Sequence, residues 1–231
     1  MSAQLVERLY KSLYSSTHNK IICAGRNFFH SASVESGRHK GINNELVIFD
    51  KTFNSIMRSG EVLYLQRENK IHHGVELGFM IGMTGKNIKP EEYDKYIEGY
   101  FIGIDFTDKD LHTTARKNGS PWTMAKAQDG FLAVSGFVAK HKIRNPHDLE
   151  IQLKINKQHT QRENTRQMIT QIPELISHIS QYVTLREGDL IMTGTPSGGG
   201  EASAGDFIEV SLRQQNKDLA NLFMKIDKIH Q

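Results

Sequence analysis

The chain has 231 residues, and its 29 lysines and arginines nearly balance its 26 aspartates and glutamates, so that the formal net charge is +3. Because basic and acidic residues are interleaved along the chain, this balance excludes a basic stripe for nucleic acid and predicts a mixed, solvated surface. The length allows one large domain, and an apolar content of 38% is sufficient for a buried core.

Cysteine usage and hydropathy exclude two further classes of protein. Cys23 is the single cysteine, which rules out an internal disulfide and a zinc site with several cysteine ligands. The longest apolar run, Leu77–Met83, is far shorter than the roughly 20 residues of a membrane-spanning helix. We therefore expect no transmembrane segment.

Residues 1–17 form a segment of their own. Leu5, Leu9 and Leu13 are spaced four apart, which predicts a short helix with one apolar face. Basic residues and a serine-rich end are typical of a mitochondrial presequence, whereas Glu7 is not. Two interpretations stay open: a cleaved mitochondrial signal, or a retained helix that packs on the body of the protein or on a partner.

The remaining residues, 18–231, carry mainly strand patterns. Two long apolar runs, Val75–Met83 and Tyr100–Phe106, predict strands that are buried on both faces. Apolar runs or alternation predict further strands at residues 21–24, 46–49, 62–65, 149–155, 190–193, 208–212 and 222–226. A polar hairpin or arm is expected at residues 156–164.

Three segments have helical signals. Pro90 followed by acidic residues predicts a helix start within residues 89–96, and residues 110–118 end at Gly119. Apolar residues at helical spacing predict another helix near residues 172–179. Because strands outnumber helices and follow no regular alternation with them, the predicted fold class is α+β, mostly β. No linker divides residues 18–231, which we expect to form one domain.

Several familiar catalytic motifs are missing from the sequence. The glycine-rich stretch TGTPSGGG at residues 193–200 lacks the Lys-Ser/Thr pair of a phosphate-binding P-loop. The order of His72, His73 and Glu76 matches neither the HExxH nor the HxxEH pattern of zinc enzymes. Neither a GxGxxG turn after a strand nor a GxSxG elbow occurs.

Two carboxylates at strand ends are the strongest chemical signal. Glu76 and Asp105 each lie in an apolar stretch, where an unpaired charge is costly. Two such oxygen donors suit Mg²⁺ or Mn²⁺, and Lys126 in PWTMAK would add a cation that orients an anionic substrate. From the residues alone, the alternative is that these three side chains form ordinary ion pairs at the rim of the fold.

Five stretches of the chain together resemble a known family. In order they are CAGRNF at 23–28, HHGVELG at 72–78, GYFIGIDFT at 99–107, GSPWTMAK at 119–126 and EGDLIMTGTPSGGG at 187–200. Their order resembles the fumarylacetoacetate hydrolase family, and most of all its small mitochondrial branch of acylpyruvate hydrolases and oxaloacetate decarboxylases. The resemblance implies a mixed β-roll similar to the C-terminal domain of that family, usually dimeric, with a Mg²⁺ site at its open end. Members split C–C bonds in β-diketo or oxo acids, since the metal stabilises an enolate.

The resemblance also implies roles for individual residues. Glu76 and Asp105 match metal ligands of the family. Lys126 matches a lysine that contacts the carboxylate end of the substrate, and Thr195 matches the threonine that holds this carboxylate. Lys109 takes the place of a substrate-binding arginine, which keeps the charge but loses the bidentate geometry.

Three more departures fall on the same proposed site. The family carries two glutamates after the His-His pair, and the first of them is Gly74 here, so that metal affinity should fall. In our alignment Asp50 replaces a family lysine, and we expect Lys51 to point to the opposite face of its strand. Relatives activate water with a histidine and a glutamate three apart, whereas here Ser31 occupies the histidine position. His30 and Glu35 remain the candidates for acid and base, although their spacing of five does not place them on one helix face.

These departures lead to two hypotheses about function. The first is a family member with a partly eroded Mg²⁺ site, weak or inactive as an enzyme and retained as a structural or binding subunit in a mitochondrial assembly. The alternative is an active Mg²⁺- or Mn²⁺-dependent acylpyruvate hydrolase or oxaloacetate decarboxylase with a small oxo acid as substrate. Only the second requires a metal cofactor, so the sequence leaves open whether the chain is an enzyme.

The same resemblance guides expectations about partners and location. We expect a homodimer or a subunit of a larger assembly, with the first helix and residues 156–164 as candidate contacts, and no nucleic-acid partner. The expected location is mitochondrial, with the cytoplasm as the alternative.

Overall fold

The computed structural model describes residues 19–29, 46–65 and 70–229. The helix predicted over residues 1–17 lies outside these ranges, as do His30, Ser31 and Glu35. None of the helices in the described ranges has the length and apolar content needed to cross a membrane.

Strands, arranged in three sheets, contain more of the described residues than helices do, which confirms the predicted fold class. The largest sheet has the order β2 (Val47–Lys51), β1 (Ile21–Gly25), β13 (Leu190–Met192), β6 (Val75–Ile81), β7 (Ile97–Asp105), β9 (Leu132–Val134) and β3 (Ile56–Arg58), with β10 (Val138–Ala139) also paired to β7. The second sheet has the order β12 (Gln158–Asn164), β11 (Glu150–Ile155), β15 (Phe207–Gln214), β16 (Lys217–Lys228) and β4 (Val62–Leu65). The third contains the short strands β14 (Glu201–Ala202), β5 (Ile71–His72) and β8 (Thr107–Asp108).

The helices are short and lie at the margins of these sheets. They are α2 (Lys109–Asn118), α3 (Thr123–Lys126) and α4 (Ile172–Tyr182), with the 3₁₀ turns η1 (Phe53–Ser55), η2 (Pro90–Tyr96), η3 (Lys140–Lys142) and η4 (Thr165–Gln167). The predicted end of α2 is confirmed, since Gly119 ends the helix with a left-handed φ of 64°. The helix begins one residue before the predicted start, after Asp108, which accepts a hydrogen bond from the backbone of Leu111. The segment after Pro90 forms a 3₁₀ helix rather than an α-helix.

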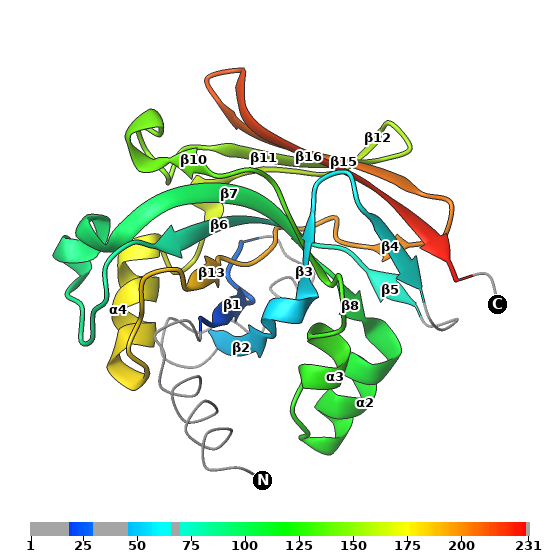
Figure 1. Ribbon diagram of the computed structural model, residues 1–231, viewed down its shortest axis with the longest axis horizontal. Helices are drawn as coiled ribbons and strands as arrows, with labels where there is room; N and C mark the ends of the chain where they lie inside the picture. Colours follow the sequence, from blue (N-terminus) through cyan, green and yellow to red (C-terminus); the bar gives the residue numbers. More distant parts are fainter. Residues whose placement is uncertain (1–18, 30–45, 66–69, 230–231) are drawn as a thin grey trace, which may run out of the picture.

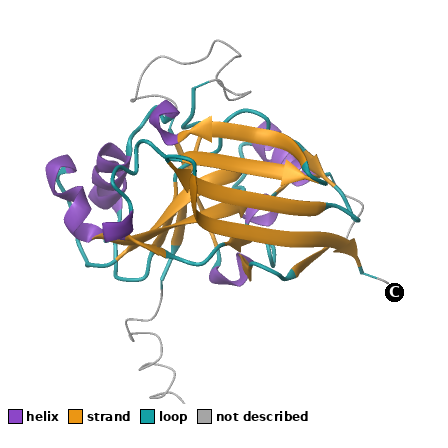
Figure 2. Cartoon of the chain, turned by 90° about the horizontal axis from the view of Figure 1, so that it is seen from above, coloured by secondary structure: helices purple, strands orange, loops and turns teal. Residues whose placement is uncertain are grey.

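The two larger sheets form the layers of the fold (Figure 1). The five-stranded sheet covers one face of the curved eight-stranded sheet, and Figure 2 shows from above that the helices lie beside or beneath the strands. The large sheet is mixed, since β1 pairs with β13 in parallel while β6 and β7 pair antiparallel. This arrangement agrees with the mixed β-roll that the family resemblance implied.

The strands β6 and β7 are buried on both faces, as predicted, and separate two apolar clusters. Side chains such as Leu77 and Ile104 belong to the main core, whereas Phe101 and Met192 belong to a smaller cluster. Because successive side chains of a strand alternate between faces, Glu76 and Asp105 point to the side of the smaller cluster. The pleat of two paired strands thus brings both acids to one side of the sheet.

Candidate functional site

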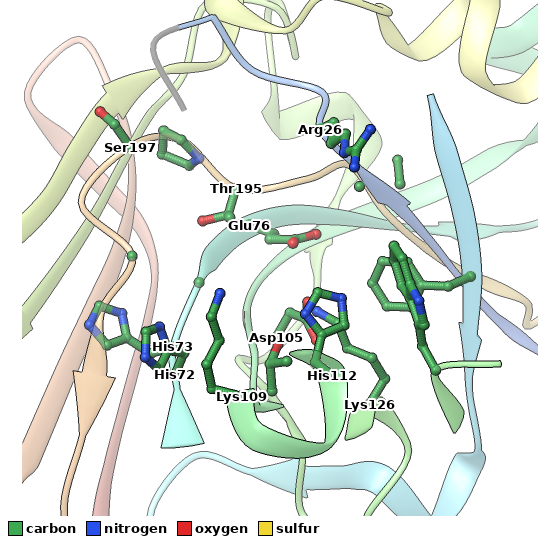
Figure 3. Close-up of a pocket in the computed structure, with 18 of the residues that line it drawn as sticks. Arg26, His72, His73, Glu76, Asp105, Lys109, His112, Lys126, Thr195 and Ser197 are labelled. Atoms are coloured by element: carbon green, nitrogen blue, oxygen red, sulfur yellow. The ribbon is translucent and has the colours of Figure 1, made fainter. Parts of the chain in front are cut away.

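All five predicted metal- and substrate-binding residues line one pocket with a volume of about 260 Å³ (Figure 3). They are Glu76, Asp105, Lys109, Lys126 and Thr195. They come from β6, the end of β7, α2, α3 and the loop that follows β13. The structure therefore brings together residues that lie far apart in the sequence.

Asp105 lies between two buried lysines. Its Oδ1 is 2.8 Å from Nζ of Lys51, and its Oδ2 accepts a hydrogen bond from Nζ of Lys126. Burial by itself raises the pKa of Asp105, but the charges of Lys126 and Lys51 lower it by a larger amount. The pKa of Asp105 is therefore below its usual value. Asp105 is consequently an ionised carboxylate with two cations beside it.

The prediction that Lys51 points away from the site was wrong. Phe49 and Lys51 face inward on β2, and it is Asp50 that is exposed. Only 3% of Lys51 is exposed, and its Nζ also donates hydrogen bonds to the backbone oxygens of Phe106 at 3.1 Å and Phe131 at 2.8 Å. The pairing of β2 with β1 turns Lys51 inward and Asp50 outward. Our alignment, which placed Asp50 at the position of the family lysine, was therefore displaced by one residue. One of the four presumed losses is therefore absent, because a lysine does reach Asp105.

Glu76 is held differently from Asp105. Its side chain is buried, and Oε2 accepts a hydrogen bond of 2.8 Å from the backbone N–H of Gly194. Burial and then the nearby charge of Asp105 raise the pKa of Glu76 to about 8, although Lys126, the Gly194 N–H and Lys51 act in the opposite direction. In the absence of a bound cation, Glu76 therefore carries a proton at neutral pH.

The pocket is rich in cations. Arg26, Lys109 and Arg116 line it together with Lys126. Arg26 has a left-handed φ of 59°, which is uncommon for a residue other than glycine. The cationic lining suits a small anionic ligand. The substrate-binding roles of Lys109 and Lys126 stay predictions.

An aromatic wall closes the side of the pocket next to Lys126. The ring of Trp122 packs edge to face with His112 at a centroid distance of 4.6 Å, and Nζ of Lys126 lies 4.5 Å from the centre of Phe49. Burial, followed by the charges of Lys126, Lys109 and Arg116, lowers the pKa of His112 to about 4. His112 is thus a neutral imidazole at neutral pH.

Our sequence analysis missed Arg26, Lys51 and His112 as residues of this site. Lys51 escaped because of the misplaced register. The position of His112 was accessible in principle, since it lies three residues after Lys109 and therefore on the same face of α2, although our predicted helix began one residue after Lys109. Arg26 lies in the stretch CAGRNF, but nothing in the sequence distinguishes it from a surface arginine. Its positive φ is seen only in the structure.

Gly74 lies against Thr195. A Cβ atom at position 74 would lie 3.0 Å from Cβ, Cγ2 and Oγ1 of Thr195, which is closer than these atoms normally approach. The glycine therefore removes a potential carboxylate and at the same time lets Thr195 pack directly on the chain before β6.

Glu76 and Asp105 are the residues that could hold a metal ion. Within the described part of the chain, no group of three or more His, Cys, Asp or Glu side chains gathers around one point. Two carboxylates nevertheless fit Mg²⁺, which commonly binds through one or two of them and completes its shell with water and substrate oxygens. Oδ1 of Asp105 lies 2.8 Å from Nζ of Lys51 and Oδ2 accepts a hydrogen bond from Lys126, so that an ion bound here would share the oxygens of Asp105 with two lysines.

Comparisons with known proteins agree with the family and with the fold. Residues 20–224 match the family described as fumarylacetoacetate (FAA) hydrolase C-terminal. The mitochondrial oxaloacetate tautomerase of Arabidopsis thaliana is 35% identical over 213 residues, which cover 92% of each chain. The mitochondrial oxaloacetate decarboxylase of Dictyostelium discoideum is 36% identical over 205 residues, 88% of this chain and 93% of the relative.

A solved structure extends this likeness to three dimensions. The crystal structure of fumarylpyruvate hydrolase from Pseudomonas aeruginosa, in complex with Mn²⁺ and pyruvate, is similar with a TM-score of 0.82 and 25% identity. The match covers 93% of this chain and 94% of that one.

We predict that Lys51→Met lowers the free energy of unfolding by about 3–5 kcal/mol, because Asp105 would keep only one of its two buried cations. Urea denaturation measures this loss. Asp50→Asn, at the exposed neighbouring position of β2, is the matched control and should change stability by less than about 0.5 kcal/mol. The reverse order of effects would contradict the register of β2.

We further predict that Glu76 makes the metal-free protein less stable as the pH rises. Between its usual pKa of 4.5 and its folded-state pKa of about 8, the folded chain keeps a proton that the unfolded chain releases. The free energy of unfolding of Glu76→Gln should therefore increase relative to that of the wild type between pH 5 and pH 8, measured by urea denaturation in EDTA. Glu98→Gln, at an exposed position of β7, controls for the loss of one charge. A constant difference between Glu76→Gln and wild type would contradict the raised pKa.

Proposed function

The chain belongs to the fumarylacetoacetate hydrolase family, and we propose that it is an enzyme that acts on small oxo acids. The observation that carries this proposal is the convergence of Glu76, Asp105, Lys126 and Thr195 in one cationic pocket. Oxaloacetate is the first substrate to test, because two relatives that cover most of the chain are named for reactions of oxaloacetate.

Of the two functions predicted from the sequence, the comparisons favour the active enzyme over the eroded subunit. The structure removes one argument for erosion, since Lys51 reaches Asp105. The replacement of a family glutamate by Gly74 remains, as does the replacement of an arginine by Lys109. We propose that these changes weaken metal binding or alter the substrate without abolishing activity.

The proposed chemistry proceeds through an enolate. In tautomerisation, the carbon next to the carbonyl loses a proton and the carbonyl oxygen gains one. In decarboxylation, the bond between that carbon and the carboxylate breaks, CO₂ leaves, and the electron pair moves through the carbon onto the carbonyl oxygen. Either way, the pocket must bind the carboxylate of the substrate and stabilise the negative charge that develops on one oxygen.

The residues of this chain divide these tasks in our proposal. Thr195 and Lys126 bind the carboxylate next to the carbonyl group, and Lys109 attracts a second anionic group. Lys51 and Lys126 keep Asp105 ionised at its place beside Glu76. His30 and Glu35 stay the candidates for acid and base, and both lie outside the described residues.

Glu76 and Asp105 would hold Mg²⁺ or Mn²⁺, which when bound supplies positive charge opposite the enolate oxygen. Support comes from the presence of two carboxylates in one pocket and from the Mn²⁺ in the related fumarylpyruvate hydrolase structure. Because Glu76 must release its proton to bind a cation, metal affinity should rise with pH towards its pKa of about 8.

Location and assembly are proposed on less direct grounds. Relatives that are named as mitochondrial support a mitochondrial location for this chain.

A homodimer remains a prediction. It is supported by a cavity of about 460 Å³ on the large sheet, where the exposed rings of Phe53 and Phe137 flank Ile56 and Met80. The predicted one-domain boundary at residue 18 also remains a proposal.

We predict that the purified protein converts oxaloacetate in the presence of Mg²⁺ or Mn²⁺ with a turnover of about 1 s⁻¹ or more. Spectrophotometry of the enol and release of CO₂ distinguish tautomerisation from decarboxylation, and acylpyruvates test the hydrolase reaction. Asp105→Asn should abolish turnover, whereas the exposed Asp129→Asn should retain it. Absence of turnover in all three reactions at saturating metal would restore the hypothesis of a structural subunit.

We also predict the effect of returning a carboxylate to position 74. Gly74→Ala adds only the Cβ that crowds Thr195, and it is therefore the proper reference for Gly74→Glu. If position 74 faces the metal, Gly74→Glu should bind Mn²⁺ about tenfold more tightly than Gly74→Ala, measured by isothermal titration calorimetry. Equal affinities would show that the cation binds elsewhere.

A further inference from the structure

We infer that Gln161 is a positioning residue that orients the Thr195 hydroxyl toward a bound carboxylate. The inference rests on the proposed function, because it assigns to Thr195 the contact with substrate. Gln161 belongs to β12, the segment that the sequence predicted as a polar hairpin and as a candidate partner contact. Its side chain instead points inward and is 2% exposed.

The amide of Gln161 joins two parts of the pocket. Its Oε1 accepts hydrogen bonds from the backbone N–H of Val75 at 2.9 Å and from Nδ1 of His73 at 3.2 Å, at the start of β6. Its Nε2 donates to Thr195 Oγ1 at 2.9 Å, to the Pro196 oxygen at 3.1 Å and to the Ser197 oxygen at 3.4 Å. One buried side chain thus ties the loop after β13 to the strand that carries Glu76.

The backbone partners decide which end of the amide is oxygen. The N–H of Val75 can only donate, and the carbonyl oxygens of Pro196 and Ser197 can only accept. Nε2 must therefore face the loop, which makes Thr195 Oγ1 the acceptor of its hydrogen bond. The hydroxyl proton of Thr195 is then left to donate to a ligand, and a carboxylate is an acceptor that requires such a donor.

A β-bulge explains how an edge strand delivers this side chain. Leu153 of β11 pairs with Gln161, but the next residue, Lys154, pairs with His159, so that Thr160 is an extra residue in β12. Bulges redirect neighbouring side chains and are frequent beside active sites. The loop approaches the bulge closely, since a Cβ at Gly198 would lie 2.1 Å from the backbone oxygen of Thr160. Gly198 therefore permits the contact on which the Gln161 hydrogen bonds depend.

The decisive substitution is Gln161→Glu, which keeps the shape and the acceptor for Val75 but removes the donor for Thr195. The ionised carboxylate of this variant would accept the hydroxyl proton of Thr195 in a hydrogen bond of its own, in competition with the ligand. We expect the dissociation constant for pyruvate, measured by calorimetry with saturating Mn²⁺, to increase about tenfold or more. Gln158→Glu places the same charge on an exposed position of β12 and should leave the dissociation constant unchanged.

A double-mutant cycle separates positioning from a general loss of structure. Thr195→Val removes the hydroxyl at nearly constant volume, and in this background Gln161→Glu should weaken pyruvate binding by less than about twofold. Thr195→Ser restores a hydroxyl, and the sensitivity to Gln161→Glu should return. Equal effects of Gln161→Glu in the wild-type and Thr195→Val backgrounds would overturn the inference.

A second measurement does not depend on ligand binding. In metal-free protein, Gln161→Glu should increase amide hydrogen exchange in residues 195–199, whereas Gln158→Glu should not. If the wild type fails to bind pyruvate, the proposed function is wrong. If, in addition, Gln161→Glu leaves hydrogen exchange in residues 195–199 unchanged, the positioning role is wrong as well. If the wild type binds pyruvate and Gln161→Glu binds it equally well, only the positioning role is wrong.

Discussion

The site depends on the burial of Asp105 between Lys51 and Lys126. A carboxylate at the inner end of β7 would be strongly destabilising alone, and either lysine alone would be equally costly in this interior. Together the three side chains place an ionised acid at a defined position in an apolar sheet. Their geometry also determines the state of the neighbouring acid, since the negative charge of Asp105 contributes to the raised pKa of Glu76.

The pocket therefore has two acids in different protonation states. Asp105 is a fixed anion, whereas Glu76 releases its proton only close to physiological pH. Neighbouring carboxylates whose environments separate their pKa values are a general device for dividing chemical roles. In the function that we propose, this device would link metal binding to pH, and a glycine at position 74 in place of a third carboxylate would make the link more important. Glu76 and Asp105 would then each contribute a larger share of the attraction for the proposed cation.

Secondary structure and the main candidates for the site were predictable from local patterns. The strands β6 and β7 were predicted from continuous apolar runs, and the end of α2 was predicted from the glycine that follows it. Each of these signals can be read from neighbouring residues. Glu76 and Asp105 were noticeable because each interrupts an apolar strand. The sequence could not place Lys51, because inward and outward positions of the short strand β2 differ only by its register against β1. Likewise, nothing local distinguishes Gln161 from the polar residues around it.

By itself, the sequence determined the family, the mostly β fold and the pair of acids, since each follows from residue type and order along the chain. The tertiary structure alone decided which face of β2 reaches Asp105, how Thr195 packs on Gly74, and that a bulge turns Gln161 into the interior. The physical reason is that a one-residue change of strand register reverses every side chain while leaving composition and periodicity the same. Only pairing with a distant strand can select between the two arrangements.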